Sequence, residues 1–152
     1  MMEPCYVFAA GGVRFAVPLA ALRRVHRVEE VTRVPCAPEA VAGVALLLDE
    51  VVGCLDPGRL AGRPALPPGP CVAALVETPD LRFALLAAEV GSTEELDPAR
   101  LGPLPADLAE RLRTVARGLA ELAGGAAVAL DLAALASAVA PRWTAAEAHV
   151  PA

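Results

Sequence analysis

Short apolar segments separated by turn signals recur through the first half of the chain. Residues 6–8 and 13–17 flank the Ala-Gly-Gly sequence at 10–12, which is typical of a β-hairpin turn. The odd positions of 13–17 are apolar, as expected of a strand with one buried face. Residues 41–48 and 51–55 are also apolar and are separated by a short acidic interruption. We predict two further strands there, joined by a tight turn.

The same pattern restarts after a proline-rich break at residues 62–70. Four prolines in nine residues cannot donate hydrogen bonds to a sheet, which predicts a loop or linker. Beyond it, 71–76 and 81–87 form a second predicted hairpin. Residues 105–122 carry apolar side chains at helical spacing and give the strongest helix prediction, while 132–139 predicts a short terminal helix.

Together these elements predict a mainly β protein built as two small packed barrels with one or two short helices. We expect the folded domain to cover residues 1–140, with its two halves meeting near the proline-rich segment 62–70. The polar, alanine-rich residues 141–152 are expected to form a flexible C-terminal tail.

Composition decides how such a core is filled and which partners are excluded. Hydrophobic residues make up 56% of the chain but aromatic residues only 3%, so Val, Leu and Ala must fill the core. The net charge is −5, and only Arg23, Arg24 and Arg27 cluster among the basic residues. Nucleic-acid binding requires a concentrated basic surface. We therefore exclude nucleic acid as a partner.

Few residues could support catalysis or hold a cofactor. No lysine is present, which excludes a phosphate-binding loop of the P-loop kind. Neither serine lies in a G-x-S-x-G motif. Zinc ligands usually come in closely spaced pairs, and the cysteines are too widely separated for that. We predict a non-enzymatic protein without cofactor or metal, whose thiols are reduced and whose adjacent acidic residues cover turns. The residues concerned are Cys5, Cys36, Cys54, Cys71, His26, His149, Ser92, Ser137, Glu29, Glu30, Asp49, Glu50, Glu94 and Glu95.

Residues 123–140 are the only candidate for a membrane span. They are mostly alanine and contain Asp131, whose charge would cost about 3 kcal/mol at the bilayer centre. The N-terminus lacks the basic and long apolar regions of a signal peptide. We expect a cytoplasmic protein without direct membrane insertion.

The most specific sequence feature is the segment 34–44, which reads VPCAPEAVAGV. It is similar to the signature V-P-x-(A/T)-P-x-x-(I/V)-x-G-(I/V) of the CheW-like domain family. Residues 51–56 resemble that family's V-V-P-V-(I/V)-D strand, and Leu-Asp-Leu at 130–132 its closing strand. The resemblance covers residues 5–139 and rests on several weak motifs in the right order.

This resemblance implies two five-stranded SH3-like barrels packed on one core. It also implies an adaptor that couples chemoreceptors to a histidine kinase. The implied partners are the cytoplasmic tip of a chemoreceptor, the regulatory domain of a CheA-type kinase and other CheW-like proteins. The apolar run at 41–55 is dense enough to bury one face and leave another open for docking. We predict a partner-binding surface formed by Val41, Val44, Leu46, Leu47, Leu48, Asp49, Glu50 and Val52.

The chain departs from the family pattern at four positions. Where the family has a Leu-Arg-Gly turn, Leu48 replaces the arginine and Asp49 the glycine; Gly53 replaces a strand proline, and Ala88 an aspartate. Leucine cannot supply the guanidinium donors of arginine. We therefore predict a divergent adaptor with altered receptor, kinase or lattice contacts. The alternative is a small ligand-sensing or catalytic domain on an SH3-like scaffold. The alanine- and arginine-rich composition is typical of a high-GC bacterium such as a myxobacterium.

Overall fold

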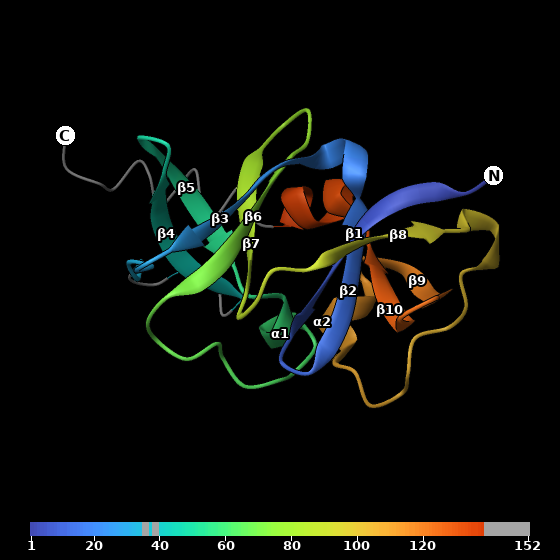
Figure 1. The fold of residues 1–152 in the computed structure, drawn as a ribbon. Helices are drawn as coiled ribbons and strands as arrows, with labels where there is room; N and C mark the ends of the chain where they lie inside the picture. Colours follow the sequence, from blue (N-terminus) through green and yellow to red (C-terminus); the bar gives the residue numbers. More distant parts are fainter. Residues whose placement is uncertain (35–36, 38–39, 139–152) are drawn as a thin grey trace.

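The computed structural model describes residues 1–34, 37 and 40–138, which form two five-stranded sheets (Figure 1). The first sheet has the order β8-β1-β2-β10-β9 and the second β3-β6-β7-β5-β4. The strands of the first sheet are β1 (Glu3–Ala10), β2 (Val13–Pro18), β8 (Ser92–Leu96), β9 (Ala116–Leu122) and β10 (Gly125–Leu130). Those of the second are β3 (Leu22–Val28), β4 (Val41–Leu47), β5 (Glu50–Leu55), β6 (Cys71–Glu77) and β7 (Arg82–Ala87).

Short helices connect these strands. They are the 3-10 turns η1 (Leu19–Ala21) and η2 (Pro98–Arg100), the single helical turns α1 (Pro57–Leu60) and α2 (Glu110–Arg113), and a helix over residues 132–138. In Figure 1 this last helix, in red, lies between the two sheets. The predicted mainly β fold with two five-stranded units and few short helices is confirmed.

In each sheet, one isolated pair of backbone hydrogen bonds joins the two edges, so that the sheet approaches a closed barrel. In the second sheet, Thr32 and Val44 exchange backbone hydrogen bonds of 2.8 Å in both directions. In the first, Gly102 and Leu119 do the same at 2.8 and 2.9 Å. Both pairs join the segment after one edge strand to the opposite edge strand. We refer to the two units as the first barrel and the second barrel.

Successive side chains along each strand point to opposite faces of the sheet, so the buried residues form three separate cores. Each barrel has its own interior, and a third core is shared between the barrels. On β1, for example, Cys5 and Val7 face the first barrel's interior, whereas Tyr6 and Phe8 face the shared core. Because both faces of these strands are buried, they read as nearly continuous apolar runs.

The buried aromatic side chains of the described residues lie in the shared core, whereas aliphatic side chains and cysteines line the interiors of the two barrels. Phe15, Phe83 and Leu112 are completely buried between the barrels. The interior of the first barrel is lined by smaller side chains, namely Cys5, Val7, Ala16, Leu96, Ala120, Ala127 and Ala129. This division explains how a chain with 3% aromatic residues builds a packed core.

The predicted helix over 105–122 is wrong. Only α2 forms a helical turn there, and residues 116–122 are strand β9. Leu112 and Val115 are buried in the shared core, but Ala120 faces the interior of the first barrel. The apolar spacing that resembled a helix therefore combines a turn packed between the barrels with an alternating strand.

The proline-rich segment 62–70 also does not separate the two barrels. It connects α1 to β6, while β5, β6 and β7 belong to the same sheet. The chain instead changes barrel between β2 and β3 and again between β7 and β8. The predicted tail, 141–152, lies outside the described residues.

Candidate functional site

The β4–β5 hairpin, residues 41–55, forms one edge of the second sheet. Its inward positions are buried: Ala45, Leu47 and Val52 face the interior of the second barrel. The intervening positions face outward, so the strand pair presents an outer surface next to the closing seam. Period-two alternation therefore decides which predicted docking residues can reach a partner.

Three large apolar side chains are exposed on this hairpin. Leu46 is 65% exposed, Leu48 55% and Val51 69%. Leu46 and Val51 are direct cross-strand partners, one pair away from the turn that contains Leu48. The other large exposed apolar residues among those described are Met1, Met2 and Val90. We call Leu46, Leu48 and Val51 the apolar tip.

The turn of this hairpin has an unusual sequence for its backbone. Leu48 and Asp49 have φ angles of 51° and 65°, in the left-handed region. The β1–β2 hairpin uses nearly the same angles, 61° and 77°, at Gly11 and Gly12. Side chains in this region cost roughly 1–2 kcal/mol per residue relative to glycine. The second barrel thus places a leucine at a tip where the backbone favours glycine.

Arginine and glutamate side chains alternate in a row of ion pairs next to the apolar tip. Arg82 Nη1 donates to Glu50 at 2.6 Å, and Arg82 Nη2 donates to Glu77 at 3.1 Å. Arg23 Nε donates to the other oxygen of Glu77 at 2.8 Å. These hydrogen bonds from Arg23 and Arg82 lower the pKa of Glu77. The row connects β3, β6, β7 and β5 on the exposed end of the barrel.

Only part of the predicted docking set can reach a partner. Leu46, Leu48, Asp49 and Glu50 are exposed, and Val44 is half-buried. Val41, Leu47 and Val52 are buried and serve the core instead. Sequence reasoning missed Val51, although its alternation with buried Val52 could have revealed it. On β4 the outcome follows from the strand's two faces, because buried Ala45 and Leu47 alternate with exposed Leu46.

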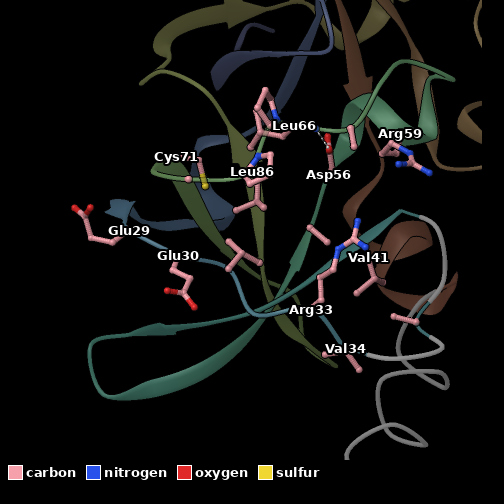
Figure 2. Close-up of a pocket in the computed structure, with 17 residues that line it drawn as sticks. Glu29, Glu30, Arg33, Val34, Val41, Asp56, Arg59, Leu66, Cys71 and Leu86 are labelled. Atoms are coloured by element: carbon pink, nitrogen blue, oxygen red, sulfur yellow. Dashed lines mark hydrogen bonds between the residues drawn. The ribbon is translucent and has the colours of Figure 1, made fainter.

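A cavity of about 1090 Å³ lies at the opposite end of the hairpin (Figure 2). Its apolar lining includes Leu66, Cys71 and Leu86, and in Figure 2 the acidic Glu29 and Glu30 flank the side opposite Arg59. The remaining lining residues are Val31, Arg33, Val34, Ala37, Val41, Ala42, Asp56, Ala65, Pro67, Pro68 and Gly69. The proline-rich segment thus forms one wall of the cavity.

Asp56 holds that wall in place. It is the buried charged residue of the described chain, only 4% exposed. Its carboxylate accepts hydrogen bonds from the Leu66 N–H at 2.7 Å and from the Gly58 N–H at 3.2 Å. The second bond caps α1, and the first pins the proline-rich segment to the barrel. Asp56 therefore has a structural role, with both oxygens engaged.

The residues that could take part in catalysis or metal binding lie apart from one another or are buried in the core. Cys5, Cys54 and Cys71 are buried free thiols. Burial raises the pKa of Cys54 to about 12. No group of metal-ligating residues is found within 1–34, 37 and 40–138, and no helix in those ranges is long and apolar enough to cross a membrane. Cys36 and His149 lie outside the described residues.

Two five-stranded β units packed on a shared core define the protein as a mainly β domain with two barrel-like halves. The family model for the CheW-like domain matches residues 4–140, so the chain belongs to the CheW-like domain family. Domains of this family are non-enzymatic adaptors in chemosensory signalling, whose partners in general are chemoreceptors and CheA. A comparison with curated proteins gives no match.

Among solved structures, the chain is similar to the scaffolding protein TtCheW from Thermoanaerobacter tengcongensis. The TM-score is 0.70 at 16% sequence identity, over 86% of this chain and 89% of TtCheW. At that identity the likeness supports the shared fold. The family assignment rests on the match to the family model.

Proposed function

We propose that this protein is an adaptor that couples the cytoplasmic tip of a chemoreceptor to a CheA-type histidine kinase, and that the apolar tip is a docking surface. One observation carries the proposal: three large apolar side chains are exposed together on one hairpin. Exposed apolar clusters of this kind mark protein interaction sites. Within the predicted set, the docking residues are Val44, Leu46, Leu48, Asp49 and Glu50, to which we add Val51.

We further propose that this adaptor is a divergent member of its family. The family's turn arginine would present a charged fork to an acidic partner group, whereas Leu48 presents an aliphatic surface. Such a change favours a partner with an apolar pocket and disfavours one that relies on an ion pair. We also propose that the protein is cytoplasmic, because the receptor tip lies in the cytoplasm.

Binding measurements with two purified probes test these proposals. The probes are the regulatory domain of the CheA-type kinase and a receptor cytoplasmic fragment from the same organism. We expect the kinase domain to bind, and the variant Leu46→Glu to bind at least about thirtyfold more weakly. Leu48→Arg with Asp49→Gly restores the family turn and is expected to change affinity by about tenfold or more. Equal affinity and equal kinase activation by this variant would contradict the divergence.

The cavity favours ligand sensing as a second candidate function. Its volume suits a small molecule, and its lining combines apolar walls with a few charged groups. A ligand bound there would raise the unfolding midpoint by mass action. A metabolite library screened by thermal shift tests this function, and the substitution Ala65→Trp, at an exposed position of the lining, should weaken any such shift.

A further inference from the structure

The cavity in Figure 2 lies at one end of the second barrel, and its floor belongs to that barrel. Cys71 and Leu86 on the floor are part of the barrel's buried core, and Val31 and Leu66 pack against the same core. The floor is therefore an apolar surface built into the fold. Ligand sites occur preferentially at such places, in the mouths of β-barrels. The charged groups around the floor then decide which ligand fits.

One end of the cavity is acidic. Strands β3 and β6 are antiparallel, and their pairing ends at Val28 and Cys71. Glu29 and Glu30 follow β3, so they lie next to the end of the proline-rich segment, which precedes β6. Both glutamates are exposed, and neither forms an ion pair among the described residues. We call this side the acidic end; it can accept a cation.

The wall that borders the acidic end is rich in hydrogen-bond acceptors and poor in donors. Pro67 and Pro68 have no N–H, and the N–H of Leu66 already donates to Asp56 at 2.7 Å. In the part of the chain that the structure describes, no backbone hydrogen bond reaches the carbonyls of residues 65–69. An ammonium group carries three donors and no acceptor. It therefore matches both the carboxylates and this wall.

The other end of the cavity is basic. Arg33 lines it, is exposed and forms no ion pair within the described ranges. Figure 2 shows its guanidinium on the side of Arg59, away from the carboxylates of Glu29 and Glu30. A guanidinium can bind a carboxylate through two parallel hydrogen bonds. We call this side the basic end; it fits a ligand carboxylate.

The proline-rich wall indicates how far apart the two ends lie. Leu66 is held near the basic end by Asp56, and Gly69 lies beside the acidic end. The three residue steps between them span at most about 10 Å. An extended tripeptide has about the same span between its termini. A free amino acid is too short to reach both ends, because its two charged groups are attached to one carbon atom.

We infer that the cavity binds a zwitterionic peptide of about three residues with an apolar side chain in the middle. Its ammonium group lies at Glu29 and Glu30, its carboxylate at Arg33, and its middle side chain on the apolar floor. The inference names the ligand class for the second candidate function, ligand sensing, on which it rests. It does not depend on the adaptor function.

Calorimetric titration of the protein with the tripeptide Ala-Leu-Ala tests the inference. We expect a dissociation constant of about 0.1 mM, as for a ligand of this size. Three altered peptides each lack one of the recognised groups: Ala-Gly-Ala lacks the apolar side chain, an acetylated N-terminus lacks the cation, and an amidated C-terminus lacks the anion. Each should bind at least about fivefold more weakly.

Two variants assign the ends of the peptide. Glu29→Gln with Glu30→Gln should weaken binding of the free tripeptide about fivefold and leave binding of the acetylated one unchanged. Arg33→Gln should weaken binding of the free tripeptide similarly and leave binding of the amidated one unchanged. The matched controls are Glu121→Gln and Arg24→Gln, whose side chains are exposed and lie outside the cavity lining. Both should bind the tripeptide as the natural protein does.

Three results would overturn the inference: no saturable binding of Ala-Leu-Ala, equal affinity for the free and the capped tripeptides, or equal weakening by the control variants. If a metabolite then gave a thermal shift that Ala65→Trp weakens, ligand sensing would stand with another class of ligand. If no compound gave a shift, ligand sensing would fall as well. The adaptor function is tested separately, by binding of the kinase domain and the receptor fragment.

Discussion

Gly43 lies where the second barrel closes, and it has no room for a side chain. A Cβ placed there would lie 2.0 Å from the Thr32 carbonyl oxygen, the acceptor of one of the two closing hydrogen bonds. We predict that Gly43→Ala separates the seam and lowers the free energy of unfolding by about 3 kcal/mol or more. Denaturant unfolding of the purified variant measures the change.

Gly12 provides the control for this prediction. Its φ is also positive, at 77°, but a Cβ there would meet nothing within 4 Å. Gly12→Ala should therefore cost only the backbone strain, roughly 1–2 kcal/mol. Equal losses in the two variants would show that backbone strain, and not the contact with Thr32, decides the effect at the seam.

The thiol of Cys54 predicts a pH dependence at the alkaline end. Burial raises its pKa from 9.0 to about 12 in the folded protein. Above pH 9 the unfolded chain releases this proton while the folded protein retains it, so stability falls as pH rises from 9 toward 12. The slope for this group approaches about 1.4 kcal/mol per pH unit. Cys54→Ala should flatten the decline by that amount in unfolding measured at several pH values.

At the scale of elements, hairpins were predictable from sequence and the region before β9 was not. Alternation and turn residues identified β1–β2, β4–β5 and β6–β7, because strand faces and tight turns leave local signals. The helix predicted over 105–122 failed because Leu112 is buried in the core shared by the two barrels and Ala120 in the interior of the first barrel. Helical spacing of apolar residues cannot distinguish one buried face from two separate burial sites.

The β4–β5 turn yields a prediction that separates stability from binding. Replacing Leu48-Asp49 with Asn-Gly supplies residues that favour the left-handed angles of 51° and 65°. We expect the hairpin to gain about 1 kcal/mol in stability while binding of the kinase domain weakens through loss of Leu48. Thermal unfolding and calorimetric titration of the same variant measure both. A gain in stability with unchanged affinity would show that Leu48 does not belong to the proposed docking surface.

At the scale of the whole molecule, the class of fold was predictable but the path of the chain between barrels was not. The proline-rich segment 62–70 has the composition of a linker, yet it spans two strands of one sheet and is pinned by Asp56. The order of the strands along the sequence does not predict that β8, β9 and β10 lie in the same sheet as β1 and β2. That pairing depends on contacts between residues far apart in the chain. The apolar hairpin at 41–55 was predictable as a segment, and only strand orientation showed which of its residues are exposed.

The interleaved path has an energetic consequence, because the two barrels share one core. Leu112 is fully buried there, in contact with a cluster drawn from both sheets and from the helix over 132–138. We predict that Leu112→Ala lowers the free energy of unfolding by about 2–5 kcal/mol and destabilises both barrels together. Hydrogen exchange of amides in β2 and in β7 should accelerate by the same factor, whereas exposed Leu46→Ala should change neither by more than about 0.5 kcal/mol. Faster exchange in one barrel alone would mean that each barrel unfolds independently in spite of the shared core.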